Sequence, residues 1–345
     1  MKINNKIIYE DVNSLSPIKG EEKYFNKKIL ITGCNGLIGT YLSFYFISKK
    51  KYYNCEVYLT SFSKELNSEK FDIKTQDNFN YFSWDINYDF PEEYKLKYDF
   101  VFYCSGYAQP SKFIIDPITT ANINVKGTTA ILNFLENKSS FIYMSSSEIY
   151  GNPDALNIPT KETYVGIHNL ESNRAAYIYS KILGEILVSS YKDYLHIKIC
   201  RISLTYGPGT SFEDERVLQQ LIQKAINLKK IELIDDGSAL RTYSYILDTI
   251  EMILNVSTSG KDLTYNIANP YDTISILDLA NLVATFLNVN VTSSTIKTNN
   301  IVANNSPKVV RMSIEKYLNE YEKKEFKSMN YGVKNILKYF FLVNE

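Results

Sequence analysis

The sequence predicts an α/β protein with a doubly wound parallel sheet and a smaller, partly interleaved C-terminal lobe. Three observations support this prediction. Short β-type runs alternate with longer helical stretches between residues 28 and 202, as expected of βαβ units. A glycine-rich turn joins the first β-type run to the first helical stretch. After residue 202 the alternation becomes irregular, which indicates a second lobe.

The predicted strands are short apolar runs that end in polar turns. They are Lys28–Thr32, Glu56–Thr60, Asn80–Trp84, Phe100–Cys104, Ser140–Ser145 and His196–Ile202. Helical stretches lie between them, and the clearest are Leu37–Lys49, Ile118–Glu136 and Ala175–Tyr191. This order predicts parallel strands with helices on both faces of the sheet.

The same pattern suggests a division of the chain. Residues 1–24 precede the first strand and are predicted to form an N-terminal arm. Residues 25–202 form the sheet domain, with a return to it near residues 240–268, and residues 203–345 form the second lobe. In that later part we predict helices at Val217–Leu228 and Ile276–Leu287, and Leu263–Ala268 rejoins the sheet.

Composition argues against several classes of protein. The 345 residues carry no net charge and no basic block, so we expect neither nucleic acid nor a membrane surface as partner. No apolar run approaches the roughly 20 residues that span a bilayer, and the start of the chain lacks a signal pattern. The four scattered cysteines indicate buried thiols in a reducing cytoplasm. With only two histidines, a metal centre or a Ser-His-Asp hydrolase is not expected.

Arginine is rare, which draws attention to each one. Only five of the 38 basic residues are arginines. A planar guanidinium is suited to phosphate or carboxylate, so these positions are candidates for anion binding, with ordinary salt bridges as the alternative. They are Arg174, Arg201, Arg216, Arg241 and Arg311.

The turn after the first predicted strand has glycines at three-residue spacing, Gly33, Gly36 and Gly39. Glycines let the backbone approach a pyrophosphate, which the N-terminus of the following helix then stabilises. Leu37 and Ile38 open that helix. A Rossmann-type dinucleotide site is therefore predicted here.

The ribose end of this site lacks its usual carboxylate. In NAD-binding proteins an acidic residue about 20 positions on binds the ribose 2′-hydroxyl. Here the second strand ends in Thr60-Ser61-Phe62-Ser63-Lys64, with Ser61 as the contact and Lys64 able to accept a 2′-phosphate. NADP is therefore an alternative cofactor. Asp85 and Ile86, after the third strand, are predicted to contact the adenine.

Tyr177 and Lys181 lie four residues apart on a predicted helix, so both project from one face. An ammonium beside a phenol lowers the phenol pKa and lets it act as a base towards a hydroxyl. The spacing alone is weak evidence, because tyrosine and lysine are both abundant in this chain and Tyr24/Lys28 and Tyr45/Lys49 share it.

A serine-rich segment, Ser145 to Gly151, follows a predicted strand about 30 residues upstream of this pair. Open α/β sheets bind ligands at the carboxyl ends of their strands. Ser146 is therefore predicted to share the hydrogen bond to a substrate oxygen, with Glu148 facing the same pocket.

Together these features resemble the extended short-chain dehydrogenase/reductase family, which contains NAD-dependent epimerases and dehydratases. The resemblance runs from Ile29 to about Arg311 and includes the glycine spacing and the Tyr177/Lys181 pair. Within the family the chain is most similar to UDP-glucuronate decarboxylases, whose pattern residues 162–181 match without a gap. The resemblance implies NAD as the cofactor and a UDP-linked nucleotide sugar as the substrate.

The resemblance also implies roles for individual residues. Tyr177 would be the base, and Lys181 would lower the pKa of its phenol. Ser146 would align the C4 oxygen of the sugar. Glu148 and Arg241 would face the ring near C5 and C6. The other implied substrate contacts are Ser147, Arg174, Arg216 and Tyr206.

Oxidation at C4 would turn a glucuronate into a β-keto acid, which loses CO2 readily because the ketone accepts the electrons. Ser147 stands where 4,6-dehydratases have an Asp, and 4-epimerases usually lack a carboxylate at position 148, so both positions favour decarboxylation. Leu204 replaces a family Asn that contacts the diphosphate, and residues 178–180 differ from the decarboxylase pattern.

Three alternatives stay open within the family, namely a 4-epimerase, a 4,6-dehydratase or a 4-ketoreductase acting on another sugar. An alternative of another class is a non-catalytic dinucleotide-binding scaffold, against which the intact Ser146, Tyr177 and Lys181 argue. The resemblance further implies a homodimer formed through Ile118–Glu136 and Ala175–Tyr191, where Ile178, Ile182, Leu183 and Ile186 form an apolar stripe.

Overall fold

The computed structural model describes residues 3–67, 70–71, 79–293, 310–323 and 325–343. Its centre is a parallel sheet of seven strands in the order β10-β6-β5-β4-β1-β2-β3. The predicted fold class is confirmed, and the last strand to join the central sheet is β10, which pairs with β6. The strands are β1 (Lys28–Thr32), β2 (Glu56–Ser61), β3 (Asn80–Ser83), β4 (Phe100–Tyr103), β5 (Ser140–Ser146), β6 (His196–Ile202) and β10 (Thr264–Ile267).

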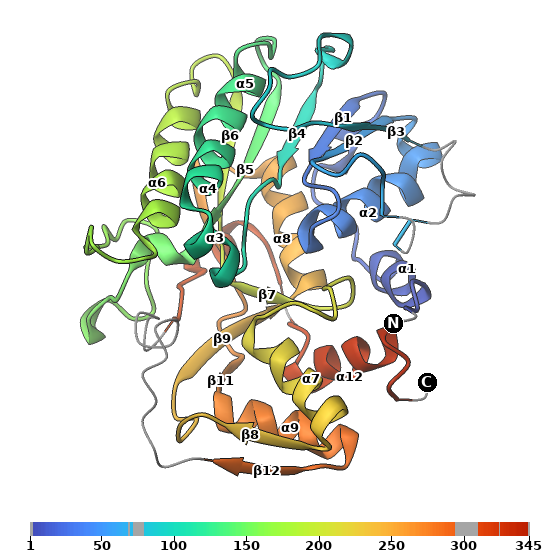
Figure 1. The fold of residues 1–345 in the computed structure, drawn as a ribbon. Coiled ribbons are helices and arrows are strands. Elements are labelled where there is room, and N and C mark those ends of the chain that lie inside the picture. The colour runs from blue at the N-terminus through green and yellow to red at the C-terminus, as the bar shows by residue number, and fades with distance from the viewer. Residues whose placement is uncertain (1–2, 68–69, 72–78, 294–309, 324, 344–345) are drawn as a thin grey trace.

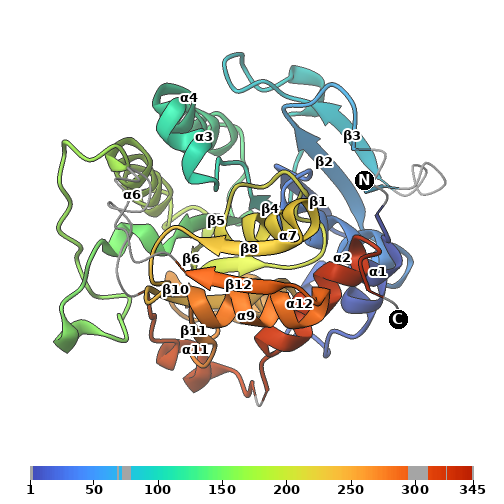
Figure 2. The same ribbon diagram turned by 60° about the horizontal axis from the view of Figure 1, so that its bottom comes forward.

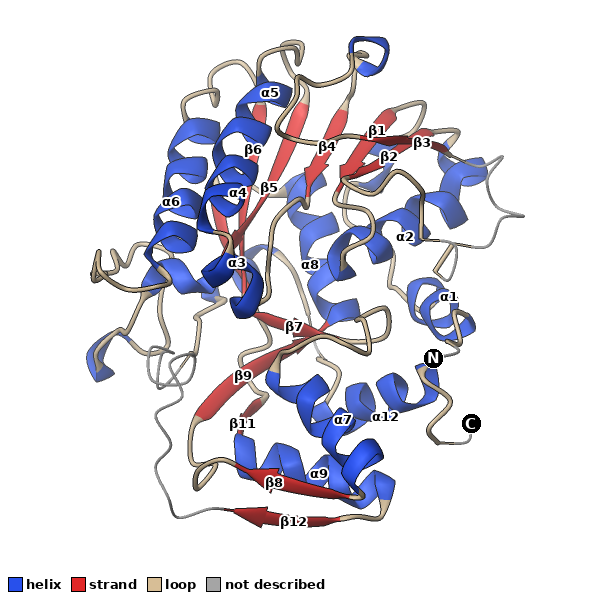
Figure 3. Ribbon diagram, in the orientation of Figure 1, coloured by secondary structure: helices blue, strands red, loops and turns tan. Residues whose placement is uncertain are grey.

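Helices cover both faces of this sheet (Figures 1 and 3). On one face α4 (Pro117–Asn122) and α5 (Thr128–Leu132) pack with α6 (Ala175–Ser189), and on the other α2 (Leu37–Tyr53) packs with α8 (Ile246–Ser259). The single helix expected at Ile118–Glu136 is wrong in detail, because a π-helical segment, η4 (Ile123–Gly127), separates α4 from α5. The sequence did not indicate α8.

The position of the site follows from the strand order. Strand β1 has β2 on one side and β4 on the other, so the direction of winding reverses between β1 and β4. In open α/β sheets, ligands bind at the carboxyl ends of the strands beside such a reversal. Thr32, Ser61, Tyr103 and Ser146 end β1, β2, β4 and β5 at this edge.

The part of the chain after β6 adds two small sheets and several helices, shown from below in Figure 2. Strand β9 lies between β7 and β11, and β8 pairs with β12 beside α9. The elements are β7 (Leu204–Tyr206), α7 (Val217–Leu228), β8 (Lys230–Leu233), β9 (Leu240–Tyr245), β11 (Thr273–Ser275), α9 (Ile276–Leu287), β12 (Asn290–Ser293), α11 (Glu315–Glu320) and α12 (Met329–Tyr339). Shorter helical segments are α3 (Pro110–Ile115), η1 (Glu21–Tyr24), η3 (Glu92–Tyr94), η5 (Ser147–Tyr150) and η6 (Ala155–Asn157).

The N-terminal arm packs against both lobes of the protein. Its helix α1 (Lys6–Asn13) contacts α2 and α12. The buried carboxylate of Asp11 accepts hydrogen bonds from the hydroxyls of Tyr41 (2.8 Å), Tyr331 (3.3 Å) and Tyr245. Because these tyrosines come from α2, α12 and β9, one buried carboxylate joins the arm to both lobes.

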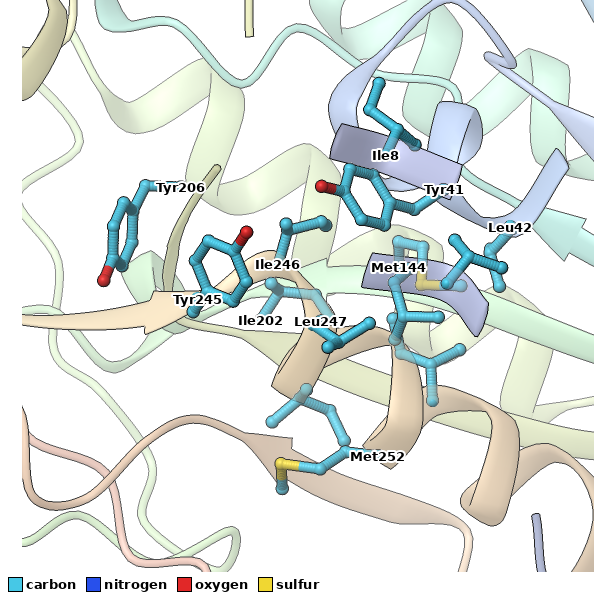
Figure 4. Close-up of a cluster of buried hydrophobic side chains, with 14 of the residues drawn as sticks. Ile8, Tyr41, Leu42, Met144, Ile202, Tyr206, Tyr245, Ile246, Leu247 and Met252 are labelled. Carbon is cyan, nitrogen blue, oxygen red and sulfur yellow. The ribbon is translucent and has the colours of Figure 1, made fainter. Parts of the chain in front are cut away.

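One hydrophobic core runs through these parts (Figure 4). Ile8 of the arm, Tyr41 of α2, Met144 of β5 and Tyr245 of β9 all belong to it and are buried. The burial of such apolar surface is the main force that holds the lobes together. In the described part of the chain, no helix is long and apolar enough to cross a membrane.

Candidate active site

A cavity of about 710 Å³ opens at the carboxyl ends of the central strands. Loops after β1, β2, β3, β4, β5 and β6 all contribute to its wall, as the strand order predicts. Fourteen of the residues predicted for the site line this cavity. They are Gly33, Gly36, Leu37, Ile38, Gly39, Ser61, Asp85, Ile86, Ser146, Ser147, Glu148, Tyr177, Lys181 and Arg216.

The glycines of the turn after β1 are required by the backbone. Gly33 has φ +62°, and a Cβ there would lie 2.7 Å from the carbonyl oxygen of Cys104 on the neighbouring strand. A Cβ on Gly39 would collide with the carbonyl oxygen of Gly33. Side chains at these positions would therefore prevent α2 from approaching the strand as closely as it does.

The start of α2 is suited to a pyrophosphate. Gly36 is the N-cap, and no side chain accepts a hydrogen bond at this cap. The N–H groups of the first helical turn therefore face the cavity without an internal partner, where the helix dipole favours an anion. The turn fits a dinucleotide, and Leu37 and Ile38 at the helix start would hold it.

At the predicted ribose and adenine end, Ser61, Asp85 and Ile86 all line the cavity. The Ser61 hydroxyl accepts a hydrogen bond from the side-chain amide of Asn35 (3.0 Å). Asp85 Oδ1 accepts from the backbone and the side-chain nitrogen of Asn87, both at 3.0 Å, so this carboxylate also caps the turn after β3.

Tyr177 lies at the start of α6, is buried and lines the cavity. Its ring stacks on that of Phe113 of α3, with 4.3 Å between the ring centroids. Burial is the main cause that raises the pKa of its phenol, and the negative charge of Glu148 raises it further. A hydrogen bond with Ser146 and the positive charges of Arg174 and Arg216 act in the opposite direction. The free site therefore keeps this phenol protonated.

Lys181 lies one turn further along α6 and is also buried. Its Nζ donates to the carbonyl oxygen of Met144 at 2.7 Å, which aims the ammonium at the end of β5. Burial lowers the pKa of Lys181 to about 8. The Lys181 ammonium is thus held beside the cavity, and its pKa lies close to neutral pH.

The carboxylate of Glu148 forms an ion pair with Arg174. Arg174 Nη1 lies 2.5 and 2.7 Å from the two carboxylate oxygens of Glu148. The backbone N–H of Glu148 donates to Ser146 Oγ at 3.2 Å. Arg174 itself stays outside the cavity lining but fixes a lining residue.

A second ion pair lies across the cavity from α6. Arg216 donates to Asp214 through Nε and Nη2, at 2.9 Å each, and both residues line the cavity. The side-chain amide of Gln109 donates to Asp214 at 2.8 Å. This places a guanidinium at the mouth of the site, where a phosphate would meet it.

Arg241 and Tyr206 lie outside the cavity lining. Burial and the charge of Arg174 lower the pKa of Arg241, while the charge of Glu148 opposes the shift. Arg241 therefore lies near the Glu148–Arg174 ion pair. Tyr206 is buried, and a Cβ on Gly332 would collide with its ring. Their substrate contacts stay predictions.

Other lining residues were not predicted. Gln109 and Asp214 were missed, although Gln109 follows a strand end and Asp214 shares a segment with Arg216. Lys70 lines the cavity from a segment without any motif, so no sequence signal pointed to it.

Comparison with known proteins agrees with this geometry. The description "NAD dependent epimerase/dehydratase family" matches residues 29–268. UDP-glucuronic acid decarboxylase 1 of Arabidopsis thaliana is 29% identical over 201 residues, 57% of this chain and 46% of that protein. UDP-glucuronic acid decarboxylase 1 of Xenopus tropicalis is 26% identical over 273 residues, 77% of this chain and 62% of that protein. The match therefore spans only about half to three fifths of these relatives.

Solved structures share the fold. The UDP-N-acetylglucosamine 4-epimerase of Methanobrevibacter ruminantium M1 superposes with a TM-score of 0.76 at 18% identity, covering 92% of this chain and 99% of that one. The UDP-glucuronic acid 4-epimerase of Bacillus cereus, solved with UDP-glucuronic acid and NAD, gives 0.75 at 21% identity, covering 91% and 99%. Since the family description covers most of the chain, this protein belongs to the NAD-dependent epimerase/dehydratase family of enzymes, whose cofactor is NAD.

Proposed function

We propose that the protein modifies a nucleotide sugar through oxidation at C4, and that it decarboxylates UDP-glucuronate. The observation that supports this most is the convergence of Tyr177, Ser146 and Glu148 on one wall of the cavity whose other end fits a dinucleotide. The family's relatives named as UDP-glucuronic acid decarboxylases support the substrate.

Tyr177 would take the proton of the C4 hydroxyl. Ser146 lines the same cavity as this phenol, so a sugar oxygen placed beside both would be aligned for proton transfer. NAD, when bound, accepts the hydride from C4 and later returns it. The positive charges of Arg174 and Arg216 favour the phenolate, whereas the buried ammonium of Lys181 donates to the carbonyl oxygen of Met144.

The charges behind the wall favour an acidic sugar. Two guanidiniums, those of Arg174 and Arg241, lie near the carboxylate of Glu148 and bring positive charge to this region. A uronate carboxylate would complement that charge. Ser147 offers only a hydroxyl where a dehydratase would need an acid, so loss of CO2 is the favoured outcome after oxidation.

Glu148→Gln is expected to lower the rate of CO2 release by about 100-fold, because it removes a carboxylate beside the reacting carbons. It should leave NAD affinity unchanged, since Glu148 forms hydrogen bonds with Ser146 and Arg174 and, among the described residues, with none of the glycine turn. The assay is release of labelled CO2 from UDP-glucuronate that carries ¹³C at C6. The matched control is Glu171→Gln, an exposed glutamate in the segment between η6 and α6, which should retain the wild-type rate.

The same assay separates the competing reactions. Conversion of UDP-glucuronate to its C4 epimer with the labelled carboxyl retained would make the protein an epimerase and contradict decarboxylation. A wild-type rate in Glu148→Gln would remove Glu148 from the mechanism.

We also propose a homodimer formed through α4 and α6. The predicted apolar stripe divides in two: Ile178 is buried, whereas Leu183 and Ile186 of α6 are 43% and 59% exposed. Ile118 of the adjacent α4 is 75% exposed. Apolar side chains grouped in this way are suited to a second copy of the same surface.

Ile186→Asp is therefore expected to convert a dimer to a monomer, because it places a charge in the centre of the apolar surface. Light scattering coupled to size exclusion measures the mass. Leu228→Asp changes a similarly exposed leucine at the end of α7 and should leave the dimer intact. A monomeric wild-type protein at micromolar concentration would contradict the proposal.

A further inference from the structure

The end of β2 lacks the group that normally selects NAD against NADP. A carboxylate there accepts bonds from the ribose hydroxyls and repels a 2′-phosphate. Residues 60 to 63, at this strand end, line the cavity and include no acidic side chain. The nearby lining carboxylate, Asp85, is engaged by Asn87 in the turn after β3.

A buried cation faces this region. Lys70 is 8% exposed and lines the cavity, and its Nζ donates to the carbonyl oxygen of Asn35 at 2.8 Å. In the described residues no carboxylate pairs with it, and burial lowers its pKa to about 8. Burial of an ammonium is costly unless an anion compensates it, so a phosphate that enters the cavity would be stabilised here.

Lys70, Asn35 and Ser61 are linked by hydrogen bonds beside the end of β2. The carbonyl of Asn35 holds Lys70, and the side-chain amide of Asn35 donates to Ser61 Oγ at 3.0 Å. Tyr81 Oη lies 2.9 Å from the same hydroxyl. An ammonium, an amide and a hydroxyl are thus gathered where the second strand of a Rossmann fold meets the adenosine ribose.

We propose that Lys70, Ser61 and Asn35 form a site for the 2′-phosphate of NADP, so that the protein takes NADP as well as NAD. Sequence alone suggested Lys64 for this purpose. Lys64 is exposed and lies outside the cavity lining, whereas Lys70 is buried in it. The proposal concerns the cofactor site and does not depend on the sugar reaction proposed above.

The other anion within reach is the pyrophosphate that NAD and NADP share, for which the start of α2 already provides N–H donors. The two cases differ in a measurable way. A lysine that serves the pyrophosphate affects both cofactors alike, whereas a lysine that serves the 2′-phosphate affects NADP alone.

The test is titration calorimetry of the full chain with NAD and with NADP, which needs no substrate. We expect the wild type to bind NADP within about tenfold of NAD. Lys70→Met should weaken NADP by about 10- to 100-fold, as expected for loss of a charge-assisted hydrogen bond, and change NAD by less than about threefold. Lys64→Met should change neither affinity.

Ser61→Asp provides an independent test, because it introduces a carboxylate at the end of β2 and leaves Lys70 in place. It should weaken NADP by a similar factor and leave NAD bound as well as, or better than, before. The proposal is overturned if Lys70→Met weakens both cofactors equally, or if the wild type binds NADP more than about 100-fold more weakly than NAD. Because only binding is measured, a failure here leaves the decarboxylation test unaffected.

Discussion

Replacing Tyr177 by phenylalanine is expected to lower turnover by at least about 1,000-fold, because it removes the hydroxyl that takes the substrate proton. The change should leave the site otherwise intact. The ring of Tyr177 stacks on Phe113, and phenylalanine retains that stacking. The measurements are the turnover of UDP-glucuronate and the affinity for NAD, and only the first should fall.

The matched control for this variant is Tyr179→Phe, two residues further along α6. Tyr179 is 38% exposed and lies outside the cavity lining. It should keep the wild-type rate. More than about a tenth of wild-type turnover in Tyr177→Phe would show that another group acts as the base. Loss of NAD binding instead would show that the phenol serves the cofactor site.

Arg201→Met is expected to destabilise the protein by about 3–5 kcal/mol, because it leaves the carboxylate of Glu185 buried without its partner. Arg201 on β6 donates to Glu185 on α6 through Nε (3.0 Å) and Nη2 (2.8 Å), and both side chains are nearly buried. Glu185 also accepts a hydrogen bond from the hydroxyl of Ser145, the residue before Ser146. The pair therefore joins α6 to the strand end that carries Ser146.

The free energy of unfolding by urea measures this effect. The control is Lys28→Met, which breaks the exposed pair between Lys28 and Glu56 on neighbouring strands and should have little effect. Combining Arg201→Met with Glu185→Gln should recover part of the loss, because the orphaned charge is then gone. Equal effects of Arg201→Met and Lys28→Met would contradict the role given to the buried pair.

Much of the sheet could be predicted because its strands are buried on both faces. Segments such as Ile29–Ile31 are continuous apolar runs, and they remain in register between two neighbours. The second lobe was harder to predict. Its strands β7, β8 and β11 have three or four residues each, too short for periodicity to stand out. Helix α8 is buried nearly all round, so it lacks the polar face that marks a surface helix.

The site could be predicted only in part. Groups that occupy strand ends or fixed helical spacings, such as Ser146 and the Tyr177/Lys181 pair, line the cavity as expected. The Glu148–Arg174 bond joins residues 26 apart, and Lys70 reaches Asn35 across 35 residues. Such contacts depend on how loops pack over the sheet, and no local pattern in the sequence encodes them.

The measurement that tests the central claim most directly is mass spectrometry of UDP-glucuronate after incubation with the purified protein and NAD. We predict a nucleotide sugar that has lost one CO2, in wild type but not in Tyr177→Phe. An unchanged mass in the wild-type reaction, with NAD shown to be bound, would contradict decarboxylation of this substrate. Other nucleotide sugars would then be the ones to screen, with Leu204 in the cavity wall as the first residue to examine for the difference.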